Sequence, residues 1–417
     1  MRIRDLIERS LELSRSIPYR HISDSPTIKS YTNWLEYDKY SIVSELGEDL
    51  LEIFSEDMPK KIGPMLNSYD IVYYGSKLFK RDINGVEIGF LERRDLLKDY
   101  SNDKLFRLVD PEESRIYARH IGGISSVLIL RLHKTLAKPL KIFIGGGLPK
   151  TQISQHVLTL IEEGVEASII IATEPLSNSM RTFVGEYYID RSAGLRIGLI
   201  NMGGVADFHS NHYLLSQDSS LEIYTLSMGG AASRFQNRVG LEGDYSRHAS
   251  YSLTISSGSE WIHFIDSSLL RGSNTISYVT SRALALGKSK NIVQGYITQR
   301  ETAKKSRANV DVSALNVGGE ALTVTTPFLL VETGEVEEAV HSSSQAIMDQ
   351  DTMVYLRSRG FNERDIIELV VSDYVGDYIE KVPEYMREIF IEYIERYFRD
   401  RGIRIISLEE LRGEVEF

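Results

Sequence analysis

The spacing of hydrophobic residues changes twice along the chain and divides it into three regions. Residues 1–121 mix helical and strand-like spacing and are mainly helical. Residues 122–345 carry short strand-like runs punctuated by Gly and Ser, with no long helical period after residue 190. Residues 346–417 return to helical spacing. We therefore predict an N-terminal helical region, a central β domain and a C-terminal helical domain with these boundaries.

The N-terminal region contains signals for several short elements. Its first residues repeat apolar side chains at helical spacing, and residues 42–53 predict a second amphipathic helix. Residues 70–91 predict a small hairpin that turns at Asn84-Gly85, a pair typical of two-residue β-turns. Asp110, followed by proline and two glutamates, predicts the start of a further helix.

The central region contains ten strand-like runs. They cover residues 127–132, 141–144, 167–172, 195–202, 221–228, 251–256, 275–279, 291–298, 310–317 and 321–330. Asn-Gly and Asp-Gly, the best markers of tight hairpins, are absent between residues 190 and 345. This absence favours strands stacked in a coil over a meander. The pattern itself leaves a sandwich, a barrel and a β-solenoid open.

Three helices are predicted after the β domain. The first covers 349–359 and ends at Gly360, the second covers 366–378, and the third begins at Pro383-Glu384. The third helix has a broad apolar face that includes Met386, Ile389, Phe390, Tyr393, Ile394 and Tyr397. That face suits docking into the groove of a partner, and the alternative is packing against the protein's own β domain.

The amino-acid composition excludes several classes of function. The chain has no cysteine, which excludes disulfides, cysteine-ligated metals or clusters, and a cysteine nucleophile. A formal net charge of −11 argues against nucleic acid as the main partner. The charged N-terminus lacks an apolar export signal and no apolar run could span a membrane, so we expect a cytoplasmic protein. The glycine-rich segment 143–151 predicts only a turn, because Pro149 stands where a phosphate loop needs a free N–H.

Two histidine-containing segments are candidates for metal binding. Asp207, His209 and His212 lie close together, but their spacing suits neither one helix face nor one strand face, and a polar loop fits better. Four glutamates between residues 332 and 338 precede His341. A histidine beside carboxylates can form a hard-metal or proton-handling site, and the alternative is an acidic strand end with an exposed histidine.

Four segments near the C-terminal half carry a recognisable series of motifs. They are VDVSALNVGGE (310–320), PFLLV (327–331), EVEEAVHS (335–342) and DQDTMVYLRSRGF (349–361). The series resembles the SufB/SufD family, whose members are subunits of an iron–sulfur cluster assembly scaffold. The run YLRSRG (355–360) is especially characteristic and follows the histidine at the family's spacing. The good match covers about 285–380, with a weaker match back to about 195.

The resemblance implies a fold and partners. The central domain would be a right-handed parallel β-helix, flanked by the N-terminal region and the C-terminal helices. The end of the β-helix would pair with a SufB-like chain or with a second copy. The C-terminal helices would dock a SufC-like ABC ATPase, which binds the ATP. The residues expected to contact the partner are Tyr355, Arg357, Arg359, Met386, Ile389, Tyr393 and Tyr397.

The resemblance also suggests a role for one histidine. Family members commonly have Cys-Ser-His-Gly where this chain has Ala339-Val340-His341-Ser342. The family's histidine lies at the subunit interface, so His341 is a possible iron ligand there. Ala339 replaces the cysteine, so this chain cannot carry a persulfide and resembles the SufD side of the family. No cofactor would bind stably, although iron or a nascent iron–sulfur cluster could pass through the complex.

We therefore expect a non-catalytic, SufD-like scaffold subunit. Two alternatives are a stand-alone homodimer that binds the ATPase without a SufB-like chain, and a β-helix enzyme acting on carbohydrates. The acids of such enzymes line a groove, whereas the acids here cluster at one end of the β region, which argues against the enzyme.

Overall fold

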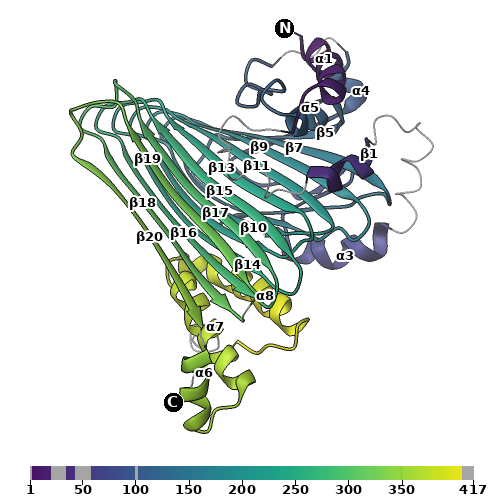
Figure 1. Ribbon diagram of the computed structural model, residues 1–417. Coiled ribbons are helices and arrows are strands. Elements are labelled where there is room, and N and C mark those ends of the chain that lie inside the picture. Colours follow the sequence, from purple (N-terminus) through teal and green to yellow (C-terminus); the bar gives the residue numbers. More distant parts are fainter. Residues whose placement is uncertain are drawn as a thin grey trace.

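The computed structural model describes residues 2–19, 34–42, 58–98, 102–318, 320–348 and 350–405. Its centre is a parallel β-helix of about eight turns, flanked by helices at its N- and C-terminal sides, as Figure 1 shows. The predicted fold class is therefore confirmed, and the β-solenoid is the correct choice among the all-β alternatives. The helix predicted over 42–53 falls almost wholly outside the described residues.

Two ten-stranded sheets form the β-helix. Sheet A contains β1 (Ser41–Ile42), β4 (Val86–Glu92), β5 (Ile124–Leu132), β7 (Thr151–Ile161), β9 (Met180–Ile189), β11 (Ala206–Leu215), β13 (Ser233–Leu241), β15 (Trp261–Leu270), β17 (Lys290–Gln299) and β19 (Leu322–Val331). Sheet B contains β2 (Ile71–Tyr74), β3 (Lys77–Lys80), β6 (Leu140–Gly145), β8 (Glu166–Thr173), β10 (Gly194–Met202), β12 (Ser220–Met228), β14 (Arg247–Ser256), β16 (Ile276–Leu286), β18 (Arg307–Val317) and β20 (Glu338–Met348). The chain alternates between the sheets, so each turn adds one strand to each.

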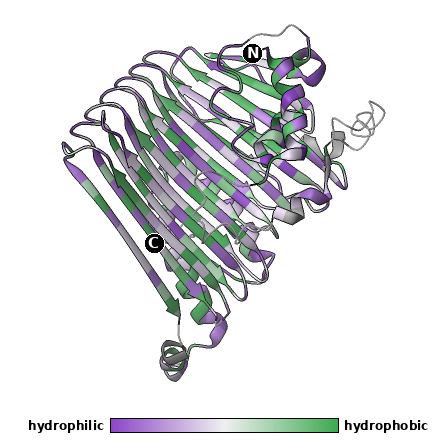
Figure 2. Cartoon of the chain, turned by 45° about the horizontal axis from the view of Figure 1, so that its top comes forward, coloured by the Kyte–Doolittle hydropathy of each residue, from purple (hydrophilic) through white to green (hydrophobic). Residues whose placement is uncertain are grey.

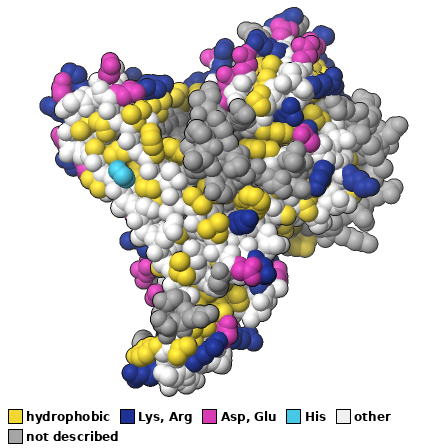
Figure 3. All heavy atoms as spheres, in the orientation of Figure 1, with side chains coloured by type: hydrophobic (Ala, Val, Ile, Leu, Met, Phe, Trp, Pro, Cys, Tyr) yellow, Lys and Arg dark blue, Asp and Glu magenta, His cyan; other side chains and the backbone are white. Residues whose placement is uncertain are grey.

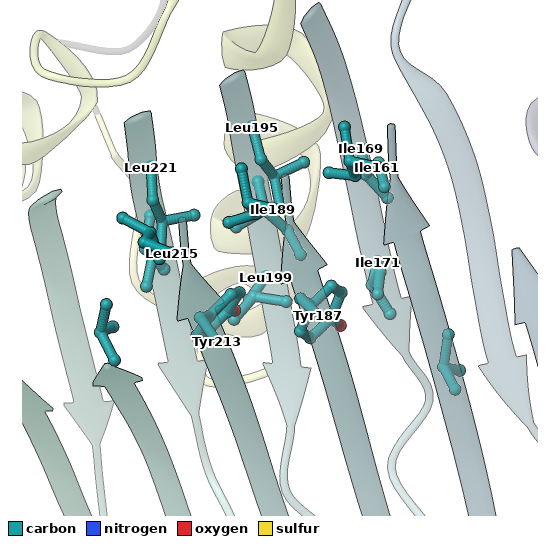
Figure 4. Packing of buried hydrophobic residues seen from close by; sticks show 14 of the residues in the cluster. Ile161, Ile169, Ile171, Tyr187, Ile189, Leu195, Leu199, Tyr213, Leu215 and Leu221 are labelled. Carbon is teal, nitrogen blue, oxygen red and sulfur yellow. The ribbon is translucent and has the colours of Figure 1, made fainter. Parts of the chain in front are cut away.

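Strands on successive turns pair in parallel register, so similar side chains stack on one another inside the coil. Ile169, Ile197 and Ile223 form one such column in sheet B. Figure 4 shows the facing side chains of sheet A, among them Tyr187 and Tyr213, whose rings stack with centroids 4.6 Å apart. Side chains alternate between the two faces of each strand, so strands of the coil also carry apolar side chains on their outer face. Figure 2 shows hydrophobic and hydrophilic residues alternating along the strands.

Six long strands of the β-helix lack the apolar runs by which strands were predicted, and five of them belong to sheet A: β7, β9, β11, β13 and β15. The five strands of sheet A bury many polar side chains and therefore lack an apolar pattern, whereas the sixth strand, β20, is exposed. The segment expected to be a polar loop is strand β11, so that prediction is wrong. Asp207 and His209 face one side of β11 while His212 faces the other, and all three are buried.

The N-terminal region supplies α1 (Ile3–Ser16), the 3-10 helix η1 (Trp34–Lys39), α3 (Met58–Ser68), α4 (Arg93–Leu96) and α5 (Arg115–Gly122). The predicted hairpin needs correction. Its two strands are β2 and β3, which turn at Gly75 with φ 61°, whereas β4 pairs with β5. The predicted helix start at Asp110 is also too early, because α5 begins at Arg115 after a turn.

The C-terminal helices are α6 (Gln350–Ser358), α7 (Glu363–Ile379) and α8 (Glu384–Arg399), as predicted. Gly360, with φ 95°, follows α6, and the Asn362 side chain caps the first turn of α7. Helices α7 and α8 pack their apolar residues against the outer face of sheet B. None of the helices that the structure describes has the length and apolarity needed to cross a membrane.

Candidate functional site

No element of the described chain caps the last turn of the β-helix. Strands β19 and β20 are the outermost strands of their sheets, so each leaves one edge unpaired within the described chain. The hydrophobic side chains exposed on this turn are Leu322, Phe328, Leu330, Val331, Val340 and Ile347. In Figure 3, hydrophobic atoms lie among neutral polar ones at the left of the view, where Figure 1 shows β19 and β20.

The charges on the edge strands distinguish the two ends. At the N-terminal end of sheet B, the edge strand β3 begins with Lys77 and ends with Lys80, and lysines on an edge discourage pairing with another chain. Strand β19 contains no charged residue, and β20 contains only Glu338 besides the histidine. The last turn is thus a largely uncharged edge, interrupted in β19 by Pro327, and it is the kind of surface that another β-sheet can extend.

His341 lies in the middle of this edge. It pairs in register with Val310, whose side chain is buried in the lumen of the β-helix, so His341 points toward the lumen side of β20. The histidine is exposed, and none of the described strands lies beyond β20 to cover it. Further along β20, Ser343 and Gln345 reach across to Thr325 of β19, at 2.8 and 2.9 Å. His341 therefore sits at a polar mouth of the lumen.

The glutamates that precede His341 do not converge on it. Glu332 pairs with Arg300 at 2.7 Å, Glu335 with Lys304 at 2.8 Å, and Glu337 with Arg307 at 2.8 Å. Each base belongs to the preceding turn, so the acids join successive turns of the coil.

The donors present at this end do not amount to a metal site. Among the described residues, no group of three or more His, Asp or Glu side chains could hold a metal ion. The described residues at this end therefore offer His341 as a single donor, which does not fit a complete iron or iron–sulfur site.

The apolar face of α8 is not free. Met386, Tyr393 and Tyr397 are at most 3% exposed, and they lie against sheet B and α3. The expectation that these three side chains contact a partner directly is corrected here, because the protein's own β-helix covers them. Ile389 is only partly buried and lines a small groove between α3 and α8.

Specific contacts hold α8 in place. The hydroxyls of Tyr69 and Tyr393 lie 2.8 Å apart, and the Tyr397 hydroxyl donates to Glu260 at 2.6 Å. Burial raises the pKa of Tyr397 well above its ordinary value, which keeps it a donor. Gly198 lets the helix approach closely, because a Cβ there would lie 2.9 Å from the Phe390 ring.

Helix α6, in contrast, stands away from the β-helix and exposes the family-like run. Tyr355 is 56% exposed, and the Arg359 guanidinium lies 5.2 Å from its ring centroid. Arg357 pairs with Glu363 at the start of α7. A groove of about 1010 Å³ separates α6 from α7 and the last turn of the coil. Val354 was not among the residues predicted from the sequence, yet it is 63% exposed beside Tyr355 and also lines the groove.

The fold and its open end define a class: a parallel β-helix with a largely uncharged terminal turn and an appended helical domain. The domain described as SUF system FeS cluster assembly, SufBD core domain, matches residues 143–374, more than half of the chain. The protein belongs to this family of iron–sulfur cluster assembly proteins. The match includes the terminal turn and reaches into α7.

Curated relatives carry the same family name. The chain is 26% identical over 145 residues to the SufBD family protein slr0074 of Synechocystis sp., covering 34% of this chain and 30% of the relative. It is 27% identical over 152 residues to ycf24 of Porphyra purpurea, covering 34% and 29%. It is 23% identical over 146 residues to the chloroplastic ABCI8 of Arabidopsis thaliana, covering 35% and 26%. The chain thus spans less than a third of each relative's length.

Proposed function

We propose that this chain is a SufD-like, non-catalytic subunit of an iron–sulfur cluster assembly scaffold. The observation that carries the proposal is the open last turn of the β-helix, because a stable coil must cover such an edge or pair it. The absence of cysteine supports the SufD side, since the chain has no thiolate to accept sulfur or ligate a cluster.

Pairing would extend both sheets of the coil across an interface with a SufB-like chain. The unpaired edges of β19 and β20 would supply backbone hydrogen bonds, and exposed side chains such as Phe328 and Val340 would supply apolar area. His341 would then lie at the joint between the two lumens. Iron or a nascent cluster is the cargo of the complex, and any ligands beyond His341 would come from the partner chain.

Docking of a SufC-like ATPase is proposed to involve α6 and the groove behind it. Val354 and Tyr355 are the exposed apolar residues of α6, with Arg357 and Arg359 beside them. The buried face of α8 would act indirectly, by fixing the helical domain on the β-helix, so that motion in the ATPase reaches the coil as a rigid-body displacement.

Native mass spectrometry tests the pairing. The chain is mixed with a SufB-type chain and a SufC-type ATPase, and we expect a ternary complex. Val340→Lys places a charge on the edge and should abolish pairing while leaving ATPase binding intact. Tyr245→Lys is the matched control, since Tyr245 is 50% exposed at a corner of the coil, compared with 47% for Val340. Equal pairing of the two variants would contradict the proposed interface.

The same measurement separates the alternatives. A dimer of this chain with ATPase, without incorporation of the SufB-type chain, would favour the homodimeric scaffold. Replacing both Val354 and Tyr355 by Asp should remove the ATPase but retain pairing. If the ATPase stays bound to that double variant, α6 is not the docking element.

A further inference from the structure

The outer face of sheet A is covered by part of the N-terminal region. Helix α5 and the segment 102–113 lie over β7, β9 and β11, and their apolar residues share one cluster with those strands. Figure 1 shows α5 beside β5, β7 and β9. We refer to residues 102–122 as the cover. Its contact with the sheet also contains a fully buried chain of polar groups.

Three hydrogen bonds link this polar chain. His120 of α5 contacts the Thr182 hydroxyl through Nδ1 at 3.1 Å and His156 Nδ1 through Nε2 at 3.1 Å. His156 Nε2 in turn lies 3.0 Å from Glu186 Oε2. All four side chains are 0% exposed. The chain therefore joins the cover to two adjacent strands, β7 and β9, without contact with water.

The carboxylate at the end of this chain also holds the cover's backbone. The N–H groups of Phe106 and Leu108 each donate to Glu186, both at 2.6 Å. Phe106 adopts φ 59°, an unfavourable region for a bulky residue, and packs its ring against His156 with centroids 4.7 Å apart. A strained residue persists only where its surroundings enforce it, and here Glu186 and His156 do so.

Other charged groups on this face have their own partners. Arg119 donates to Gln152 at 2.8 Å, and Arg238 forms a two-point ion pair with Glu113 at 2.5 and 2.7 Å. His212 lies close enough to oppose a charge on His120. A proton added to His120 would thus face two further imidazoles, with Glu186 beyond the first of them.

Burial and the neighbouring His156 hold the pKa of His120 well below its ordinary value of 6.5. His120 is therefore neutral while the cover is closed, and it gains a proton more readily once it reaches water. As the pH falls below 6.5, the open state binds a proton that the closed state does not, so acid favours opening.

We infer that the cover is an acid-releasable latch, held by the hydrogen-bonded chain from His120 through His156 to Glu186. Release would also enlarge a groove of about 800 Å³ on the outer face of sheet A. Leu108 and Glu113 of the cover line one side of this groove, and Tyr296 and Phe328 line it toward the open end of the coil. The latch thus controls a surface continuous with the last turn. It does not depend on the proposed partners.

The absence of cysteine makes a thiol-labelling test clean. Val109→Cys reports opening of the cover, since Val109 is 3% exposed within it, and Ala118→Cys is a second reporter on α5. Ala283→Cys in the lumen reports global unfolding. Each labelling rate is divided by the rate for the same variant in urea at the same pH, which removes the intrinsic reactivity of the thiol.

We expect the labelling ratio of Val109→Cys to exceed that of Ala283→Cys at every pH, and to rise about tenfold between pH 7.5 and 5.5, the limit for one proton with an ordinary pKa near 6.5. Adding His120→Gln to the cover reporter should abolish this pH dependence. Adding Glu186→Gln should raise its ratio at every pH, because an amide cannot accept from both backbone N–H groups and His156. A flat profile for the cover reporter, labelling ratios of the cover reporter no higher than those of the lumen reporter, or a pH dependence that survives His120→Gln would overturn the latch.

Discussion

A carboxyl group in the lumen of the β-helix gives the sharpest stability prediction. Asp266 of β15 is 0% exposed and pairs in register with Asn237 on one side and Gly295 on the other. Its Oδ2 accepts from the Ser250 hydroxyl, while Oδ1 has no hydrogen-bond partner among the described residues. Burial raises the pKa of Asp266 to about 7 from an ordinary 3.8, because the hydrogen bond from Ser250 does not offset the lost hydration.

The size of the stability change follows from the linkage between protonation of Asp266 and folding. Between pH 3.8 and 7 the folded protein keeps a proton that the unfolded chain has released, so the stability falls as the pH rises. Above pH 7 both states are ionised and the penalty is constant. At about 1.4 kcal/mol per pKa unit, the penalty is about 1.5 kcal/mol at pH 5.0 and about 4 kcal/mol at pH 8.5. Asp266→Asn removes this titration, so its stability relative to wild type should improve by about 2.5 kcal/mol across that range.

Urea unfolding followed by far-UV circular dichroism, at pH 5.0 and 8.5, measures this difference. The absolute effect of the amide includes a constant cost for its own NH₂ group, so the pH-dependent part is the test. Asp218→Asn is the matched control, since Asp218 is exposed at a corner with φ 59°, which asparagine tolerates. A difference between Asp266→Asn and wild type that is the same at both pH values would refute a buried, neutralised carboxyl at this position.

Three further substitutions test the packing described above. Gly198→Ala should lower the free energy of unfolding by about 1–3 kcal/mol, because its Cβ would press on the Phe390 ring, and an unchanged urea midpoint would show that α8 can shift freely. Tyr397→Phe should lower the free energy of unfolding by only about 1 kcal/mol, because it removes the hydrogen bond to Glu260. Tyr397→Asp should unfold the helical domain, which circular dichroism would detect as lost helical ellipticity, and a folded Asp variant would contradict the burial of this side chain. Burial lowers the pKa of His248 to about 3, so the unfolded chain binds a proton below pH 6.5 that the folded protein does not, and the folded protein loses stability there. The free energy of unfolding of His248→Gln should therefore rise by about 2 kcal/mol relative to wild type between pH 7.5 and 5.0. Parallel dependence of the two unfolding free energies on pH would exclude this.

The strands that could be predicted from the sequence are those whose apolar residues form recognisable runs. Most strands of sheet B were recognised because both of their faces are apolar, inward to the lumen and outward to α7 and α8. Five strands of sheet A were missed because they bury polar groups, as β11 does with Asp207 and His209. Such groups tolerate burial only when polar partners satisfy them, and Arg181, which pairs with Asp207 from the adjacent turn, lies 26 residues away in the chain.

For the candidate site, too, some features could be predicted from the sequence and others depended on the tertiary structure. Sequence alone established the absence of cysteine and the three C-terminal helices, since composition and local periodicity suffice for these. The run around Tyr355 was predicted as a contact surface only through its resemblance to the SufB/SufD family, and the structure shows that Tyr355 is exposed. Only the tertiary structure decided that Tyr393 and Tyr397 face the protein's own coil, because an amphipathic face does not specify its neighbour. It also decided that the glutamates before His341 pair with the preceding turn, because the register of stacked strands determines which charges meet.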